Sequence, residues 1–210
     1  MRGADAVTLS RLPIIVAIVY LILVKFNPIV TILLIILVTV LDAVDGMVAV
    51  WSSSGGRIGF IEYTSAALGN PNMKALVKKY KQGISKTAKH GPRMDIAGDR
   101  IIEYLLWIVF TYTGIVPLAV LIIIVIRNSF ADALMGARGT SSKMKTRAAS
   151  WLYSSNASRF AINVLKLVTF SYLVLVYVSG YSLLVGYVLI GLLAAFIVVR
   201  GAAEIYESIG

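Results

Sequence analysis

The amino-acid sequence predicts an all-α integral membrane protein with six transmembrane helices and a basic cytoplasmic insertion between the second and the third. Hydrophobic residues make up 59% of its 210 residues and charged residues only 14%, whereas soluble domains are about half apolar and about a quarter charged. Several apolar runs approach the roughly 20 residues with which a helix crosses a bilayer core. We therefore expect a single membrane-embedded domain over residues 1–210, with the insertion at about 51–90.

The six spans are predicted at about residues 9–25, 28–50, 95–114, 115–135, 156–178 and 181–203. Turn-forming residues separate the members of each consecutive pair: Pro28, then Gly114 with Pro117, then Gly180. This pattern predicts three helical hairpins with short turns, and longer connections at 51–94 and 136–155. The first apolar run lacks a signal-peptide cleavage pattern, because Lys25 and Phe26 lead directly into the second run.

The distribution of positive charge predicts the orientation in the membrane. Basic residues gather at the N-terminus and in the two long connections: Arg2, Arg11, Arg57, Lys74, Lys78, Lys79, Lys81, Lys86, Lys89, Arg93, Arg138, Lys143, Lys145 and Arg147. The short turns together hold only Lys25. By the positive-inside rule, both termini and both long connections face the cytoplasm, so we expect a cytoplasmic-membrane protein with its site on that side. No nucleic-acid motif accompanies the net charge of +10, which argues against nucleic acid as a partner.

Acidic residues are concentrated around the second and third spans. Asp42 and Asp45 lie three residues apart, and Asp95, Asp99 and Glu103 follow one another at intervals of four. Each spacing places its members on one face of a helix. Because a charge facing lipid is costly, these groups are expected to face the protein interior or a water-filled cavity.

The available ligand chemistry restricts the metals that such a group of carboxylates could bind. The chain has no cysteine and a single histidine, His90, so any metal must be held by oxygen. Carboxylate oxygens suit Mg²⁺, Mn²⁺ or Ca²⁺. Two alternatives stay open at this point: solvated carboxylates at the membrane interface, and a carboxylate-lined pathway for a cation or a proton.

Two segments of the chain resemble the signature of the CDP-alcohol phosphotransferase family. That signature reads D-x-x-D-G-x-x-A-R, a short spacer, and G-x-x-x-D-x-x-x-D. It appears here as DAVDGMVA at 42–49 and GPRMDIAGD at 91–99. The stretch ADAVTLSRL at 4–12 is similar to the segment that opens the family's first span. Six spans, with the signature across the second and third, match the family as well.

The resemblance implies a membrane enzyme of phospholipid biosynthesis. The hydroxyl of an alcohol acceptor attacks the β-phosphorus of a CDP-linked lipid, a phosphatidyl-type group is transferred, and CMP leaves. Such enzymes use Mg²⁺ or Mn²⁺, as one ion or a pair, and the resemblance implies a homodimer. Carried over by position, the metal ligands are Asp42, Asp45, Asp95 and Asp99, and Asp99 is also the catalytic base. The nucleotide site would contain Asp5, Thr8, Gly46 and Ala49.

Two departures from the family pattern concern the donor site. Val50 stands where the family has arginine, and the spacer extends over residues 51–90. Arg57, within this insertion, is our candidate replacement for the missing cation. The lysine-rich part of the insertion is either an interfacial helix on anionic lipid or a solvated loop. The lost arginine also leaves open a catalytically silent relative of the family.

A polar stripe in the fifth span suggests where the acceptor binds. Arg159, Asn163 and Lys166 follow helical spacing, and Arg127 lies inside the fourth span. Intramembrane cations usually face a cavity and find a partner. Arg127, Arg159 and Lys166 would bind a phosphorylated alcohol, such as inositol phosphate or glycerol phosphate. The structural alternative is ion pairing with Asp132 or Glu103, together with snorkelling of Lys166 to the interface.

Overall fold

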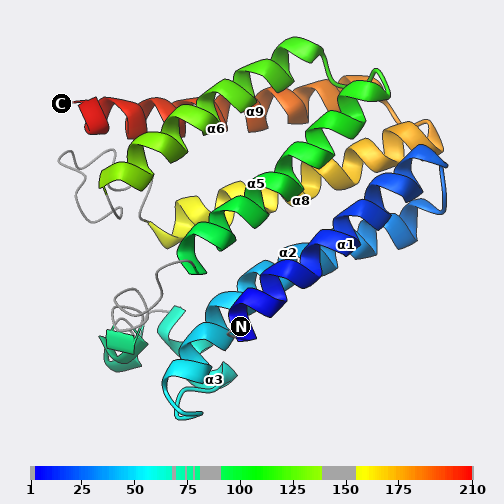
Figure 1. Cartoon of the computed structure of the whole chain (residues 1–210). Helices are drawn as coiled ribbons and strands as arrows, with labels where there is room; N and C mark the ends of the chain where they lie inside the picture. Colours follow the sequence, from blue (N-terminus) through cyan, green and yellow to red (C-terminus); the bar gives the residue numbers. More distant parts are fainter. Residues whose placement is uncertain are drawn as a thin grey trace. The chain divides into compact units, whose positions relative to one another are not determined.

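A computed structural model of the chain describes residues 3–67, 70–73, 75–77, 79–80, 91–138 and 155–209. These residues include the helices α1 (Gly3–Leu23), α2 (Pro28–Ser53), α3 (Phe60–Ala67), α5 (Gly91–Tyr112), α6 (Leu118–Arg138), α8 (Asn156–Ser179) and α9 (Leu183–Ile209) (Figure 1). The described residues between 71 and 80 are helical too, and no described residue lies in a β-strand. The prediction of an all-α protein is confirmed.

Each predicted span coincides with one of the six long helices, which contain between 21 and 27 residues. Two of them are long and apolar enough to cross a membrane, namely Ala157–Ser179 within α8 and Leu183–Ala203 within α9. Among the described residues, α1 and α2 supply shorter apolar stretches, Thr8–Leu23 and Pro28–Asp42. Of the six predicted spans, two qualify by length and composition within the described residues, not six, and the other four stay predictions.

The three short turns form where the sequence predicts them. Lys25 adopts a left-handed conformation after α1, and the Asn27 side chain accepts a hydrogen bond of 2.9 Å from the Ile29 amide at the start of α2. Gly114 ends α5 and Gly180 ends α8, both with positive φ. A residue without a Cβ atom enters this region at little cost, which is why glycine commonly ends a helix.

The chain divides into two compact units, which are described separately. The first unit comprises residues 1–18 and 33–103, and the second comprises residues 19–32 and 104–210. Helices α1, α2 and α5 contribute residues to both.

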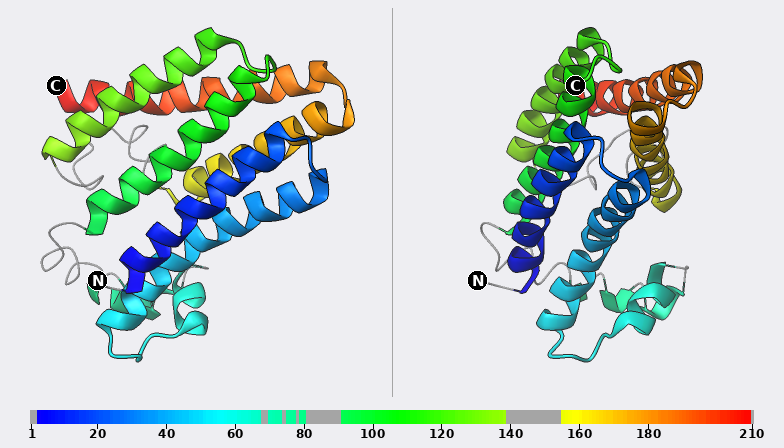
Figure 2. Two further views of the ribbon diagram at one scale, coloured as in Figure 1. Left: turned by 45° about the vertical axis from the view of Figure 1, so that its right-hand side comes forward. Right: turned by 90° about the vertical axis from the view of Figure 1, so that its right-hand side faces the viewer.

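In the first unit, the insertion builds a small hydrophobic cluster onto the end of α2. Its buried members are Val50, Ile58, Ala66 and Val77, with Tyr63, Met73 and Tyr80 packed against them. Gly55 and Gly56, both at positive φ, end α2 and turn the chain toward α3 (Figure 2). Glu62 accepts a hydrogen bond of 2.9 Å from the Gly59 amide, as the acidic member of a capping box does. The part of the predicted insertion at 81–90 lies outside the described residues, as do Lys74 and Lys78.

In the second unit, α9 packs against both α6 and α8, as Figures 1 and 2 show. Aromatic rings join α5 to α8, because Phe170 meets Trp107 edge to face, with ring centroids 5.1 Å apart, and stacks on Phe110 at 6.3 Å. Trp107, Phe110 and Leu173 are almost completely buried. The core of this unit is thus an apolar helical bundle in which α5, α6, α8 and α9 all take part.

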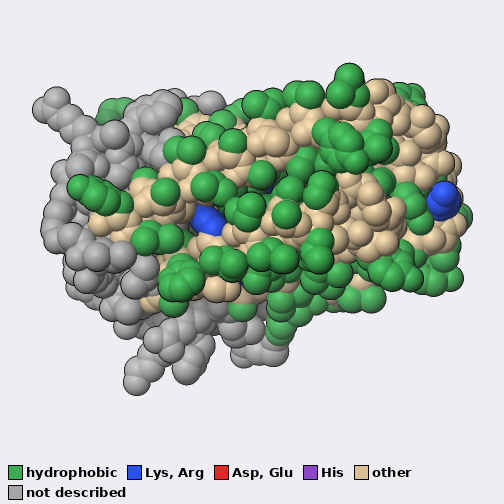
Figure 3. All heavy atoms as spheres, turned by 90° about the horizontal axis from the view of Figure 1, so that it is seen from above, with side chains coloured by type: hydrophobic (Ala, Val, Ile, Leu, Met, Phe, Trp, Pro, Cys, Tyr) green, Lys and Arg blue, Asp and Glu red, His purple; other side chains and the backbone are tan. Residues whose placement is uncertain are grey.

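The surface of the long helices is strongly apolar. Exposed hydrophobic side chains occur on each of them: Val16 and Tyr20 on α1, Ile29 and Leu33 on α2, Ile101 and Ile108 on α5, Ile122 and Phe130 on α6, Phe160 and Val168 on α8, Leu184 and Leu192 on α9. On the face drawn in Figure 3, hydrophobic side chains are spread over the described surface, and the Lys or Arg side chains seen there are few and isolated. Apolar surface of this extent is typical of chains that contact lipid or other proteins.

One close contact in the second unit predicts a stability effect. A Cβ atom added to Gly201 on α9 would overlap Nε of Arg127 on α6 and come within 2.6 Å of its Cγ. Gly201→Ala should therefore force Arg127 aside and lower the free energy of unfolding by about 1–3 kcal/mol, the usual cost of overpacking. Thermal unfolding in detergent measures this effect.

Gly191→Ala is the matched control on the same helix, because no atom lies within 4 Å of the added Cβ atom. Combining Gly201→Ala with Arg127→Ala should cost less than the sum of the two single changes, since the overlap is then gone. If the losses in free energy of unfolding of the two single variants add up to that of the double variant, the contact between Gly201 and Arg127 is contradicted.

Candidate functional site

The candidate site is a buried arginine that joins two of the predicted aspartates. Arg11 on α1 places Nη1 at 2.9 Å from Oδ1 of Asp42 on α2, and Nη2 at 2.8 Å from Oδ1 of Asp99 on α5. The Arg11 side chain is 3% exposed, while those of Asp42 and Asp99 are 31% and 45% exposed. Two carboxylates of the sequence motif, from helices far apart along the chain, therefore meet at one guanidinium.

A close approach of α1 to α5 makes this geometry attainable. A Cβ atom added to Gly98 would lie 2.7 Å from Cγ2 of Thr8, so only glycine fits here without a shift. Thr8 is buried and precedes Arg11 by about one helical turn. Thr8, predicted to lie near the nucleotide, thus packs against the residue that precedes Asp99.

Arg11 and Gly98 are the two site residues that sequence reasoning did not identify. The sequence pattern assigns Arg11 only to the orientation of the chain, and Gly98 to a spacer position of the motif. The available signal was positional, because Arg11 lies in the segment 4–12 that carries the resemblance. A basic residue in a strongly apolar helix normally finds an acidic partner, which could have indicated the pairing.

Helical backbone supports the predicted spacing of the other motif residues. Asp45, Gly46 and Ala49 lie within α2, Asp95 lies within α5, and Asp5 lies within α1. The side chains of the other four residues and the surroundings of Gly46 are outside the described part of the structure. Their predicted roles as metal or nucleotide ligands therefore stay predictions.

A second ion pair follows directly along α5. Nη1 of Arg100 lies 3.1 Å from Oε2 of Glu103, whose side chain is 4% exposed. This local pairing gives the carboxylate of Glu103 a cation on its own helix. Pairing of Glu103 with Arg127 or Arg159, the alternative from sequence, stays a prediction.

The donor chemistry of the site fits a divalent cation. Asp42 and Asp99 present oxygen atoms to one guanidinium, and carboxylate oxygen is the ligand that Mg²⁺ and Mn²⁺ prefer. The described side chains contain no group of three or more Asp, Glu, His or Cys residues that could hold a metal. Two carboxylates are thus brought together, and Asp45 and Asp95 would have to complete the set.

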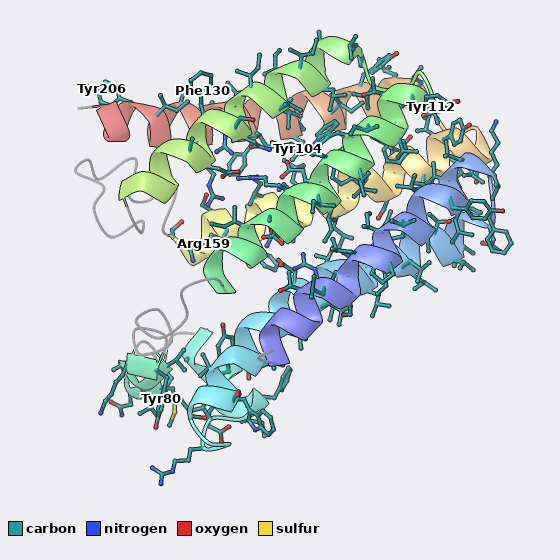
Figure 4. The ribbon with its side chains drawn as sticks, viewed as in Figure 1. Tyr80, Tyr104, Tyr112, Phe130, Arg159 and Tyr206 are labelled. Atoms are coloured by element: carbon teal, nitrogen blue, oxygen red, sulfur yellow. The ribbon has the colours of Figure 1, made fainter. Side chains whose placement is uncertain are left out.

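The residues predicted to bind the acceptor lie in the second unit, and Asp42 and Asp99 lie in the first. Nη1 of Arg127 donates a hydrogen bond of 2.7 Å to Oδ1 of Asn128. Arg159 is exposed near the N-terminal end of α8 (Figure 4), and Lys166 is half-buried two turns further along that helix. Their convergence with Asp99 stays a prediction.

Asn128 adds a feature that the sequence did not reveal. Its side chain is completely buried, and its Nδ2 atom has no hydrogen-bond partner within the described residues. Buried polar atoms are rarely left unpaired. This amide group is therefore a donor available to water or to a ligand beside Arg127.

Comparison with known proteins finds no matching family model, no similar curated protein and no similar solved structure.

The two departures from the family signature have different surroundings. Val50 is completely buried in the apolar cluster that the insertion forms, where an arginine would lose its hydration. Arg57 is exposed in the connection between α2 and α3, and its proposed role at the diphosphate stays a prediction. The valine at position 50 is therefore part of the packing of the insertion.

Arginine at position 50, the residue of the signature that the chain resembles, should destabilise this protein. Val50→Arg would bury a charge among Ile58, Ala66 and Val77, and should lower the free energy of unfolding by about 3 kcal/mol or more. Trp51→Arg is the control, because the adjacent Trp51 is 55% exposed. Equal thermal stability of the two variants would contradict the packing role of Val50.

Proposed function

We propose that the protein is a divalent-metal-dependent CDP-alcohol phosphotransferase that transfers a phosphatidyl-type group from a CDP-linked lipid to an alcohol acceptor and releases CMP. The proposal rests first on the two motif segments at 42–49 and 91–99. The structural observation that supports it most is the meeting of Asp42 and Asp99 at Arg11, since this reaction requires motif carboxylates from both segments to act together.

In the proposed reaction, the chain positions the reactants and accepts one proton. The acceptor hydroxyl oxygen forms a bond to the β-phosphorus of the CDP-lipid, and the bond between that phosphorus and the bridging oxygen breaks. CMP leaves with the bonding electron pair. Asp99 takes the hydroxyl proton, as a general base does. A bound Mg²⁺ or Mn²⁺, held by Asp42, Asp45, Asp95 and Asp99, would neutralise charge on the diphosphate.

The proposed setting is the cytoplasmic membrane, with the site and both termini on the cytoplasmic side. The apolar lengths of α8 and α9 and the exposed hydrophobic side chains of all six long helices support membrane association. We propose that α1, α2, α5 and α6 cross the bilayer as well, with their charged segments in the protein interior or near the interface. A homodimer is part of the same proposal.

For the acceptor, we propose an anionic alcohol held by Arg127, Arg159 and Lys166. Arg127 lies next to Asn128, whose buried Nδ2 donor is unpaired within the described residues. A guanidinium beside an amide donor suits phosphate oxygens, because arginine can bind them through two parallel hydrogen bonds. The phosphate of inositol phosphate or glycerol phosphate has this chemistry.

A second candidate function is a catalytically silent relative that binds the nucleotide or lipid without transfer. The burial of Val50 favours it, because the position of the family arginine is occupied by the packing of the insertion. A carboxylate-lined transporter is the third, and it would need no nucleotide. Metal-dependent CMP release by purified protein supports the enzyme over both.

The metal and carboxylate requirement can be tested in a purified system. With CDP-lipid, a panel of alcohols and Mn²⁺ or Mg²⁺, Asp42→Asn and Asp99→Asn should each reduce CMP release by about 10²–10⁴-fold, because Asp42→Asn removes an anionic ligand and Asp99→Asn removes the base as well. Glu62→Gln is the control, since Glu62 caps α3. Wild-type turnover in excess EDTA would disprove the metal requirement.

The acceptor site predicts a selective kinetic effect. Arg159→Lys should raise the KM for a phosphorylated alcohol about tenfold, because lysine loses the two-pronged hydrogen bond, while the KM for the CDP-lipid stays unchanged. The donor KM of the same variant is the internal control. Efficient transfer to serine, ethanolamine or free inositol, with phosphorylated alcohols inert, would refute the anion site. The proposal that a CDP-lipid is the donor would then still stand.

A further inference from the structure

Arg11 has a position that none of the predicted roles explains. Its guanidinium is nearly inaccessible to solvent, and it uses different nitrogens to contact Asp42 and Asp99. These two residues lie on different helices, and both are half-buried. One buried cation therefore contacts two carboxylates, and a divalent cation would compete with it for the same carboxylates.

The electrostatics of this arrangement favour a permanent counter-ion. Burial of a charge is costly unless the charge is paired, and an arginine keeps its positive charge at any physiological pH. Two carboxylates that approach one point repel each other unless a cation lies between them. Arg11 supplies that cation from within the chain, so the two aspartates can stay together when no metal is bound.

A bound metal would weaken the contacts between Arg11 and the two aspartates. A divalent cation that binds Oδ1 of Asp42 and of Asp99 takes the same oxygen atoms that Arg11 now contacts. It also brings two further positive charges close to the guanidinium, and like charges at this separation repel strongly. Both effects make it unfavourable for Arg11 and a divalent cation to contact the same two carboxylates at once.

We propose that Arg11 is an exchangeable internal counter-ion, which holds Asp42 and Asp99 together in the metal-free protein and gives up at least one of them when a divalent cation binds. This inference shares one assumption with the proposed function, namely that Asp42 and Asp99 are metal ligands. Arg11 is thus a positioning residue. It keeps the site assembled without metal and at the same time lowers the affinity for metal.

The test measures Mn²⁺ binding directly, without a turnover assay. Metal-free wild-type protein, Arg11→Gln and Lys25→Gln are titrated with Mn²⁺ in lipid nanodiscs, and free Mn²⁺ is followed by electron paramagnetic resonance. Arg11→Gln should bind Mn²⁺ on the order of tenfold more tightly, because the competing charge is gone. Lys25→Gln removes an equal charge from a residue that lies over the ring of Tyr177, and its affinity should equal that of wild type.

A second readout separates counter-ion exchange from simple support of the fold. Without metal, Arg11→Gln should unfold at a lower temperature than wild type, and Mn²⁺ should raise its Tm by more than it raises that of wild type. Arg11→Lys, which keeps the charge but lacks the planar fork, should bind Mn²⁺ with an affinity between those of wild type and Arg11→Gln. If Arg11→Gln does not fold, the Arg11→Lys result carries the test.

Unchanged or weaker Mn²⁺ binding by the Arg11 variants would overturn the inference, as would the absence of Mn²⁺ binding to every variant. Failure of the proposed function looks different. If Arg11→Gln binds Mn²⁺ more tightly but the wild type releases no CMP from CDP-lipid, the counter-ion inference holds and the transferase proposal is wrong. If CMP release depends on metal but the Arg11 variants bind Mn²⁺ with unchanged affinity, the transferase proposal holds and the counter-ion inference is wrong.

Discussion

The pairing of Arg11 with Asp42 and Asp99 is the contact on which the candidate site depends. An apolar chain with few charged residues has little means of stabilising a buried ion, so each such ion must find its partner within the protein. Here one guanidinium satisfies two carboxylates from two other helices. The contact between Thr8 and Gly98 lies beside it, so α1 and α5 approach closely where the charges meet. Charge pairing and close packing together bring the two halves of the sequence motif to one place.

Packing in the second unit follows a different principle. Its core is apolar and aromatic, with Phe170 between Trp107 and Phe110. The exception is Arg127, whose side chain occupies the space that Gly201 leaves open on α9. A small residue on one helix thus accommodates a long basic side chain from another, as small residues often do where membrane helices pack closely. Asn128 lies next to this arginine, and its Nδ2 atom has no hydrogen-bond partner within the described residues, so this region is a polar part of the bundle.

The insertion determines the surroundings of Val50, the residue that stands where the signature that the chain resembles has arginine. Because Val50 packs with Ile58, Ala66 and Val77, the end of α2 and the insertion form one hydrophobic cluster. A charged side chain at position 50 would be incompatible with that cluster. The valine at position 50 and the insertion therefore belong to one packing unit. If the protein is a transferase, another cation must serve the diphosphate, and Arg57 is the candidate that the sequence suggests.

The sequence alone determined the helices, the three short turns and the helical spacing of the acidic residues. These features depend on local properties: the length of apolar runs, the conformational freedom of Gly114 and Gly180, and the periodicity of the α-helix. Tertiary structure was needed to show that Arg11 joins Asp42 to Asp99, that Val50 is buried by the insertion, and that Arg127 lies against Gly201. Each of these contacts joins residues that lie on different helices or far apart along the chain. Such pairings are set by how closely and in which orientation helices pack, and neither composition nor periodicity contains that information.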